Sequence, residues 1–340
     1  MSSATTAVTT NGGRASGFPD EAADAEQAGT SDPASRVTPG RVRIDRYGLD
    51  LGPWLHLAEE RARLARPSFR HIDVTPQGAT VGAEVGGVDL RYELADEVTA
   101  EIRRALLDYK VLVFRGQPIT PAQHVAFARR FGELEIHPFI TGNSEHPELV
   151  RFEKGVDTGG FENGWHHDVT WREVPSMGAI LHAIQVPATG GDTLFSDMGA
   201  AYDGLGDDVK ERIDGLFAVH DFMLAFKHQV PEGKLEEFRA RYPQARHPVV
   251  CIHPETGRKL IFVNCYFTSH IDKMDESEGV DLIRHLAGQA SVVEYQFRVR
   301  WEPDTVVFWD NRSVQHYAAS DYYPDVRIME RASIVGTRPA

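Results

Sequence analysis

The sequence has 340 residues, of which 41% are hydrophobic and 25% are charged, so it can bury a substantial core in one large domain or two ordinary ones. Its formal net charge of −14 argues against a nucleic-acid partner, which would require a basic face. No apolar stretch approaches the roughly 18 residues that a membrane-spanning helix needs, and the N-terminus lacks the apolar core of a signal peptide. We therefore expect a cytoplasmic protein without a membrane partner.

The N-terminal segment differs in composition from the rest of the chain. Residues 1–40 contain Ala, Thr, Ser, Gly, Asp and Pro with almost no large apolar side chains. Such a segment cannot bury enough surface to offset the entropy of ordering, so we predict a disordered tail. Residues 41–68 are expected to form a short helical lead-in that Trp54, Leu55 and Leu57 anchor, and a folded domain is expected over residues 69–340.

That domain combines many strand patterns with a minority of helical ones. We predict strands at 79–85, 111–114, 179–183, 249–253, 260–267, 292–301, 305–309 and 327–335, and helices at 96–109, 120–132, 199–217, 233–242 and 275–288. The strands do not alternate regularly with helices, and no Gly-rich phosphate loop follows a strand, so a doubly wound α/β fold is disfavoured. The pattern favours a mainly β fold with helical insertions, either a sandwich or a jelly roll.

The motif His-x-Asp occurs three times in this sequence, as His71/Asp73, His166/Asp168 and His270/Asp272. On a strand, alternate side chains share one face, so each pair could bind one ion. A pair of this kind is more often a hydrogen-bonded pair or two unrelated side chains. We interpret the first pair as background because it precedes the first predicted strand. The third is also background, because it runs into the acidic start of a helix.

The middle pair has a companion far downstream, because His316 follows the strand predicted at 305–309 and a turn. Two imidazoles and one carboxylate form the facial triad that binds Fe(II) and leaves three coordination positions open. The same ligands would also suit Zn²⁺ in a hydrolase. A catalytically silent binding protein is a further alternative, but the presence of all three ligands argues against it.

Three more residues extend the pattern beyond the metal. Thr193 closes a Gly-Gly-Asp-Thr segment, and Arg327 and Arg331 share one face of the last predicted strand. An arginine on a neighbouring strand could bind the far carboxylate of a dicarboxylate with two parallel hydrogen bonds. Hydrolysis would leave these paired arginines unexplained, so an iron site beside a keto-acid site is the favoured interpretation.

At this point the chain resembles the taurine dioxygenase/2,4-D dioxygenase family of Fe(II)- and 2-oxoglutarate-dependent oxygenases, over most of its length. The motifs that carry the resemblance are Val113-Phe114-Arg115-Gly116, Arg130-Phe131-Gly132-Glu133-Leu134, Trp165-His166-x-Asp168-Val169-Thr170, Gly190-Gly191-Asp192-Thr193-Leu194-Phe195 and Trp309-Asp310-Asn311-Arg312-x-x-x-His316-Tyr317-Ala318. The resemblance implies a double-stranded β-helix, or jelly roll, of the clavaminate-synthase-like type. Residues 69–340 would be the dioxygenase domain.

The resemblance also implies a role for each site residue. It assigns Fe(2+) to His166, Asp168 and His316, the C5 carboxylate of 2-oxoglutarate to Thr193 and Arg327, and the C1 carboxylate and the substrate's anionic group to Arg331. The roles of the two arginines could be exchanged. The implied reaction consumes O2 and 2-oxoglutarate, releases succinate and CO2, and hydroxylates the substrate. Bond cleavage follows where the attacked carbon carries sulfur, nitrogen or oxygen.

The substrate pocket resembles the family less closely. The expected substrate contacts are His137, Asn163, Val169, Phe222, Phe226, Phe267 and Arg331, and an ungapped pairing can bring Glu162 to the position of Asn163. Ile140 stands where taurine dioxygenase has a tyrosine. We expect a small anionic organic substrate. Taurine or another alkylsulfonate, an alkyl sulfate, an amino acid and a nucleotide all stay open, as does assembly into a homo-oligomer.

Overall fold

The computed structural model describes residues 42–340 except 45, 47–48, 138–141 and 159–161. The chain divides into two compact units, residues 1–53 and residues 54–340. In the first unit, β1 (Val42–Ile44) pairs antiparallel with β2 (Leu49–Leu51). The predicted disordered tail over residues 1–40 lies outside the described residues. Every other element belongs to the second unit.

Among the described residues of the lead-in predicted over 41–68, α-helix forms at α1 (Leu57–Leu64) alone, so that prediction was too broad. Gly52 has a positive φ of 114°, and the proline that follows it disfavours helical geometry in the preceding residue. Two of the three predicted anchors do pack: Leu57 is buried and Trp54 packs against the same core cluster. Leu55 is 44% exposed and does not act as an anchor.

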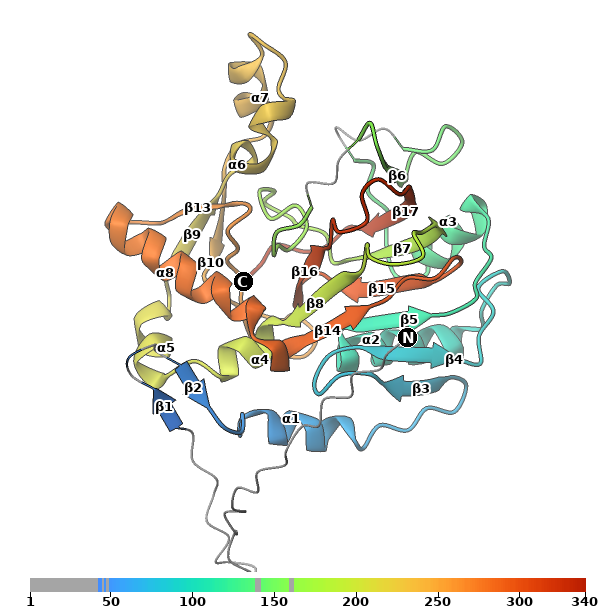
Figure 1. The fold of residues 1–340 in the computed structure, drawn as a ribbon, viewed down its shortest axis with the longest axis horizontal. Helices are drawn as coiled ribbons and strands as arrows, with labels where there is room; N and C mark the ends of the chain where they lie inside the picture. Colours follow the sequence, from blue (N-terminus) through green and yellow to red (C-terminus); the bar gives the residue numbers. More distant parts are fainter. Residues whose placement is uncertain (1–41, 45, 47–48, 138–141, 159–161) are drawn as a thin grey trace, which may run out of the picture. The chain divides into compact units, whose positions relative to one another are not determined.

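Two sheets of the second unit face each other across a shared core (Figure 1). The larger sheet has the order β3 (Asp73–Pro76), β4 (Ala83–Gly86), β5 (Val111–Phe114), β15 (Val306–Asp310), β7 (Gly178–Gln185), β17 (Arg327–Ile334), β6 (Leu149–Lys154). The smaller sheet has the order β14 (Gln296–Val299), β8 (Thr193–Asp197), β16 (Val314–Ala318). Of these pairings only β4–β5 is parallel. Side chains of both sheets share one core cluster, which includes Phe195, Trp309 and Val314. The predicted mainly β fold with helical insertions is confirmed.

Two helices pack against the larger sheet. The first is α2 (Asp96–Tyr109), whose apolar residues Ile102 and Leu106 are buried in the same cluster as strand residues of β5 and β15. The second is α3 (Pro121–Arg129), which begins with a capping box: the Thr120 side chain accepts from the Gln123 N–H, and the Gln123 side chain accepts from the Thr120 N–H. Both helices therefore form where the sequence predicts them.

A further sheet carries an excursion of the chain. It has the order β10 (Ala245–Pro248), β9 (Phe217–His220), β13 (Thr268–Ile271). Between β9 and β10 the chain forms α6 (Phe222–Phe226), η3 (Lys227–Gln229) and α7 (Leu235–Arg241), which Figure 1 shows as a yellow projection. The remaining elements are α4 (Met198–Asp203), α5 (Asp207–Ile213), β11 (Val250–Ile252), β12 (Lys259–Ile261), α8 (Glu276–Gly288), η4 (Gln289–Ser291) and η5 (Val293–Tyr295).

Several predicted elements are interrupted. The strand expected at 79–85 begins only at β4, since Gly82 has a φ of 89°. The helix expected at 199–217 is two helices with Gly204 and Gly206 between them. The strand expected at 260–267 ends at Ile261, and the Asn264 side chain then accepts two backbone N–H groups that close a turn. Each break occurs at a residue that favours turn geometry.

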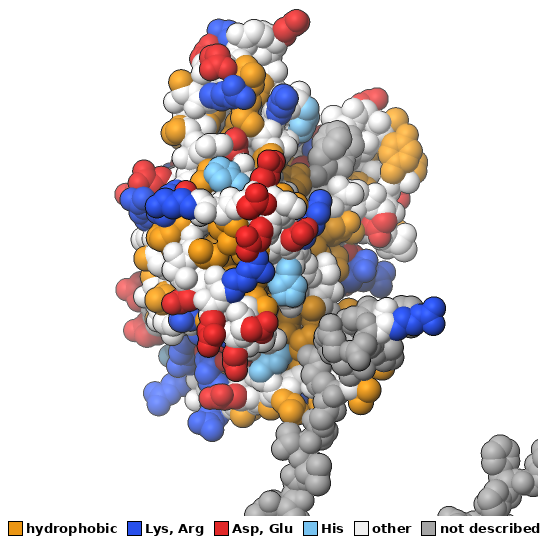
Figure 2. Space-filling model, turned by 90° about the vertical axis from the view of Figure 1, so that its left-hand side faces the viewer, with side chains coloured by type: hydrophobic (Ala, Val, Ile, Leu, Met, Phe, Trp, Pro, Cys, Tyr) orange, Lys and Arg blue, Asp and Glu red, His pale blue; other side chains and the backbone are white. Residues whose placement is uncertain are grey.

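On the face drawn in Figure 2, acidic and basic side chains of the described residues are interspersed. The net negative charge of the sequence therefore does not form one continuous acidic patch on this face. Among the described residues, no helix has both the length and the apolar composition required to cross a bilayer.

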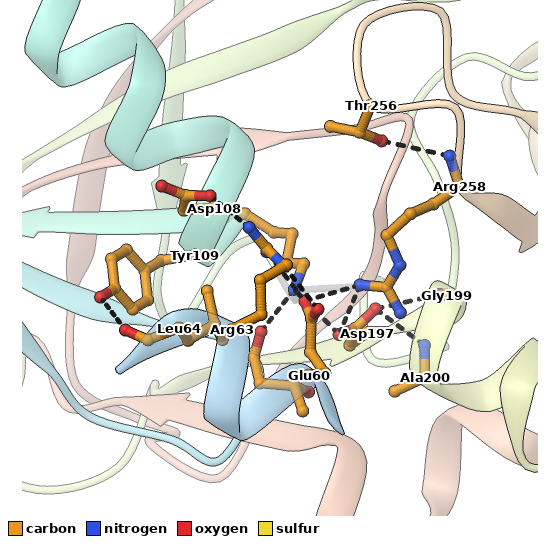
Figure 3. Close-up of polar contacts among 12 residues, drawn as sticks. Glu60, Arg63, Leu64, Asp108, Tyr109, Asp197, Gly199, Ala200, Thr256 and Arg258 are labelled. Atoms are coloured by element: carbon orange, nitrogen blue, oxygen red, sulfur yellow. Dashed lines mark hydrogen bonds and ion pairs between the residues drawn. The ribbon is translucent and has the colours of Figure 1, made fainter. Parts of the chain in front are cut away.

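A buried group of ion pairs fixes the end of β8 (Figure 3). The Lys110 ammonium lies 2.7 Å from the Glu60 carboxylate and 3.2 Å from the Asp197 carboxylate, and Arg258 lies 2.8 Å from Glu60. Asp197 ends β8 and also caps α4 by accepting two backbone N–H groups. Buried charges are tolerated only when they are paired, so these contacts hold α1, the end of α2 and β8 together.

Candidate active site

Three side chains that the sequence singles out form one buried cluster. His166 and His316 pair through an isolated antiparallel bridge, with backbone hydrogen bonds of 3.1 and 2.8 Å. The Nε2 atom of each imidazole lies 3.9 Å from an oxygen of the Asp168 carboxylate. One ligand atom from each residue lies within 4.8 Å of the others. Two imidazoles and a carboxylate in this arrangement provide the donor set of a facial metal triad.

The segment around Asp168 is a turn, so the strand alternation considered for the His-x-Asp pairs does not apply to His166 and Asp168. Outside the isolated bridge of His166, this segment has no strand pairing, and Val169 has a left-handed backbone with a φ of 48°. The Arg172 N–H closes the turn by donating to the Val169 carbonyl at 3.0 Å. Left-handed geometry is costly for a β-branched residue. His166 and Asp168 therefore meet because of this strained turn, and strand alternation does not account for it.

Asn311 holds the backbone of Asp168 in place. Its Oδ1 accepts from the Asp168 N–H at 2.7 Å, and its Nδ2 donates to the Asp168 carbonyl at 3.1 Å and to the Ser176 carbonyl at 3.0 Å. The Asn311 side chain is buried. Because buried backbone groups need partners, this one carboxamide replaces the strand neighbour that Asp168 lacks.

The contacts of His166 determine which ring nitrogen is free. Its Nδ1 lies 2.7 Å from the Gly164 carbonyl, which can only accept, so Nδ1 donates to that carbonyl and Nε2 is the ring nitrogen that faces the cluster. The Tyr266 ring stacks on the imidazole, with centroids 4.8 Å apart and an interplanar angle of 24°. Contacts of this kind orient metal-binding histidines, so His166 presents Nε2 to the cluster.

Arg331 faces the same carboxylate. Its Nη1 lies 3.1 Å from each oxygen of Asp168, and its guanidinium lies 5.0 Å from the centroid of the Phe152 ring. Burial raises the pKa of the Asp168 carboxyl, but Arg331, His316 and His166 outweigh burial and hold that pKa well below its ordinary value. Asp168 is therefore ionised at neutral pH, as a metal ligand must be.

A cavity of about 300 Å³ lies beside the cluster, and Thr193 and Arg327 both line it. Trp301 links these two residues: its indole Nε1 donates to Thr193 Oγ1 at 3.0 Å, and the Arg327 guanidinium lies 5.6 Å from its ring centroid. Arg327 is buried, and its Nε and Nη2 have no hydrogen-bond partner among the described residues. Burial lowers the pKa of Arg327. A buried guanidinium without an anion is unfavourable, so this end of the cavity suits a ligand carboxylate.

The sequence profile described as "Taurine catabolism dioxygenase TauD, TfdA family" matches residues 73–333. The chain belongs to this family. It is 33% identical to the alpha-ketoglutarate-dependent sulfate ester dioxygenase of Pseudomonas putida, over 80% of this chain and 92% of that protein. It is 34% identical to the (S)-phenoxypropionate/alpha-ketoglutarate-dioxygenase of Sphingobium herbicidovorans, over 79% and 96%. The crystal structure of AAD-2 in complex with Mn(II) and N-oxalylglycine has a TM-score of 0.70 and 30% identity, over 79% of this chain and 99% of that one.

These similarities confirm the predicted family, the jelly-roll fold and the enzyme class, a 2-oxoglutarate-dependent dioxygenase. The other two His-x-Asp pairs do not join a comparable cluster: among the described residues, three close metal-ligating side chains occur together at His166, Asp168 and His316. Asp272 is instead paired with Arg246 at 3.0 Å.

Of the expected substrate contacts, His137, Val169, Phe226, Phe267 and Arg331 line the cavity of this dioxygenase. Burial and then Arg331 and Arg172 lower the pKa of His137 to about 3. His137 is therefore neutral at pH 7 before a ligand binds, so it would contact an anion as a hydrogen-bond donor.

Two expected contacts lie elsewhere. Phe222 is fully buried and does not line the described cavity, because its ring packs against Trp171 and Tyr242 with centroids 5.2 and 5.1 Å away. Asn163 is exposed and is also absent from the described lining. Its neighbour Glu162 lines the cavity instead, which favours the ungapped pairing noted in the sequence.

Sequence reasoning missed three residues that shape the site. Asn311 holds the backbone of Asp168, Tyr266 stacks on His166, and Trp301 links Thr193 to Arg327. Asn311 belongs to the motif Trp309-Asp310-Asn311-Arg312-x-x-x-His316, so its position between a strand and the distal histidine could have indicated a role in the site. Tyr266 and Trp301 gave no such signal, because an aromatic residue near a strand is more often part of the core than of a site.

Proposed function

We propose that this dioxygenase binds Fe(II) through His166, Asp168 and His316, binds 2-oxoglutarate with the help of Thr193 and Arg327, and hydroxylates a small anionic substrate beside Arg331. The observation that carries the proposal is the buried, unpaired guanidinium of Arg327 in the same cavity as a three-donor cluster. When bound, iron and 2-oxoglutarate activate O2, so that one oxygen atom enters succinate and the other enters a C–H bond of the substrate.

The donors fit this metal and cosubstrate. The free Nε2 of His166 and the ionised carboxylate of Asp168 are in the states that metal binding requires. A dicarboxylate places its distal carboxylate away from the metal, which suits a buried arginine assisted by the Thr193 hydroxyl. Arg331 is already engaged with Asp168, so its position suits the groups that lie close to the metal. The different positions of the two arginines support assigning the C5 carboxylate of 2-oxoglutarate to Arg327.

The cavity walls favour a substrate that joins an anionic group to an apolar body. Phe152, Phe226, Tyr266 and Phe267 line the cavity, and aromatic side chains stabilise apolar ligand surface. Similar proteins are named for a sulfate ester and for phenoxypropionate, which both combine these features. We infer a sulfate ester or an aryloxy-carboxylate as the substrate class.

Taurine is a weaker candidate. Its ammonium would require an anionic partner, and the Glu162 carboxylate in the cavity wall lies 3.4 Å from the Lys154 ammonium. Cleavage follows from the inferred substrate class. Hydroxylation of the carbon bonded to the ether oxygen gives a hemiacetal, and hydroxylation next to the sulfate-ester oxygen gives a 1-hydroxyalkyl sulfate. In each product the C–O bond to the leaving group breaks as the new hydroxyl loses its proton and becomes a carbonyl, which releases the phenol or the sulfate.

Succinate release over a panel of alkyl sulfates, aryloxy-carboxylates, sulfonates, amino acids and nucleotides tests the proposal. We expect turnover with the first two groups, and Asp168→Ala should abolish it while His270→Ala preserves it. A zinc hydrolase on the same triad would instead retain zinc and show no visible charge-transfer band with anaerobic Fe(II) and 2-oxoglutarate. Full hydroxylation by Asp168→Ala would refute the assignment of the triad.

A further inference from the structure

Buried side chains also form hydrogen bonds with the residues that follow Val169 in the strained turn after Asp168. His247 places its Nε2 2.8 Å from the Thr170 carbonyl and 3.0 Å from the Arg172 carbonyl. The Thr170 hydroxyl lies 2.9 Å from His220 Nδ1 and accepts from Asn264 Nδ2 at 3.4 Å. The side chains that anchor the turn here are all buried. Thr170 therefore has three anchors, which come from β9, β10 and the turn that precedes β13.

His247 acts in one defined protonation state. Both groups that contact its Nε2 are carbonyl oxygens, which only accept, so Nε2 carries the proton and donates to both. Burial lowers the pKa of the ring, so the imidazole is neutral. One N–H group thus bridges Thr170 and Arg172 and keeps the two carbonyls close together. The Arg172 N–H closes the same turn from within by donating to Val169.

The turn needs support of this kind. The φ of 48° at Val169 is unfavourable for a β-branched residue. A conformation of this kind persists only when surrounding contacts determine it. Asn311 holds the residue before Val169, through both backbone groups of Asp168. His247 holds the residues after it, so the two side chains fix the turn from opposite ends.

We propose that His247 is a positioning residue: it fixes the turn that presents Asp168 and thereby sets the metal affinity of the site. The inference rests on the proposed function, because it requires Asp168 to be a metal ligand. His247 does not line the described cavity, so it does not contact a bound ligand there, and its hydrogen bonds act on the turn. His247 lies on β10, far along the chain from the motifs that contain His166, Asp168 and His316.

The same support reaches the substrate cavity. His220 ends β9 and His247 lies on β10, and the excursion between these strands contributes Ala225, Phe226, His228 and Gln229 to the cavity wall. The turn that carries Asp168 and the wall that a substrate contacts are therefore anchored to the same two strands. We expect the loss of the His247 anchor to uncouple the reaction, so that more succinate forms per molecule of hydroxylated product.

A matched pair of histidine variants tests the proposal. His124 is equally buried, and its Nε2 lies 3.1 Å from the Ile180 carbonyl, in the core between α3 and the larger sheet. We would compare His247→Leu with His124→Leu, measuring the affinity for Mn(II) by electron paramagnetic resonance and the melting temperature of each protein. Both variants should melt at lower temperature. Only His247→Leu should lose metal affinity, by about 10- to 100-fold, the usual effect of removing an outer-shell partner.

A conservative variant distinguishes positioning from simple destabilisation. His247→Gln keeps an N–H donor at similar reach and should recover most of the Mn(II) affinity and the coupling ratio. If His247→Leu does not fold, His247→Asn serves, since its shorter amide cannot reach both carbonyls. A folded His247→Leu or His247→Asn with wild-type Mn(II) affinity and coupling overturns the inference. Failure of the wild-type protein to bind Mn(II), or unchanged binding by Asp168→Ala, would overturn the proposed function instead.

Discussion

Replacing Arg327 with methionine should change the stability and the cosubstrate affinity of this dioxygenase in opposite directions. The guanidinium is 7% exposed, and two of its nitrogens have no hydrogen-bond partner among the described residues. In the free protein the nearby Glu162 and Asp192 carboxylates offset the desolvation cost of this cation only in part. A methionine fills similar volume without that cost, so we expect the free energy of unfolding of Arg327→Met to be unchanged or raised, by up to about 4 kcal/mol.

The affinity for 2-oxoglutarate should fall steeply. Removing one partner of a buried ion pair costs about 3–5 kcal/mol, which weakens binding by a factor of about 150 to 4,000. At a 2-oxoglutarate concentration of about 100 times the wild-type dissociation constant, the ligand should add about 2.7 kcal/mol to the unfolding free energy of the wild-type protein. At the same concentration it should add less than about 0.5 kcal/mol to that of Arg327→Met.

Urea unfolding with Mn(II), with and without 2-oxoglutarate, measures both effects. Arg331→Met is the matched control on the same strand, because Arg331 pairs with Asp168 and its removal leaves a buried carboxylate unpaired. That variant should be destabilised before any ligand is added. The reasoning is refuted if Arg327→Met is clearly destabilised without ligand, or if it keeps the stabilisation by 2-oxoglutarate.

Three further changes have definite expected outcomes. Asn311→Ala leaves three buried backbone groups unpaired, so the free energy of unfolding should fall by at most about 1–3 kcal/mol for each group. A titration with Mn(II) should also show weaker binding by this variant. Unchanged metal binding would contradict the role of the Asn311 side chain. Burial raises the pKa of Glu60, but Arg63, Lys110 and Arg258 prevail and lower it to about 2 from an ordinary 4.5. Its contribution to stability is therefore complete above pH 4.5 and is lost as the pH falls toward 2. Urea unfolding between about pH 5 and pH 3 should show a shallower decline for Glu60→Gln than for the wild-type protein, and equal slopes would count against this pKa. In steady-state kinetics, Phe226→Ala should weaken the apparent affinity for an apolar anionic substrate about tenfold, because apolar contact is lost. The apparent affinity for the cosubstrate should stay unchanged. An equal loss of affinity for substrate and cosubstrate would place Phe226 outside the wall that contacts the substrate.

Much of the fold could be predicted because its signals are local. The i, i+4 spacing of Ile102 and Leu106 and the Thr120-Pro121 start specify α2 and α3 by backbone hydrogen bonding and packing of one face. Predictions failed where one residue stops an element, as at Gly82 or Gly204. They also failed in the lead-in, where the strand pair β1–β2 depends on contacts between segments that a helical pattern does not reveal.

The donor set of the site could be predicted for a chemical reason. Only a few residue types bind iron or a carboxylate, so His166, Asp168, His316 and the two arginines stand out once their order along the chain is considered. The cavity walls are different, because any aromatic residue can serve the core or the ligand. Phe222 and Phe226 lie on the same short helix, yet only Phe226 lines the described cavity.

The sequence by itself therefore singled out the residues proposed to bind the metal and the cosubstrate, and it determined the β-rich architecture, since these depend on residue chemistry and local periodicity. Tertiary structure alone decided how the residues work together. It formed a turn at Val169, and it brought Asn311 from the turn after β15 and His247 from β10 to hold that turn. It also left Arg327 without a partner among the described residues while pairing Arg331 with Asp168. Such contacts join segments far apart in the chain, and no local pattern encodes which distant polar group will satisfy a given buried one.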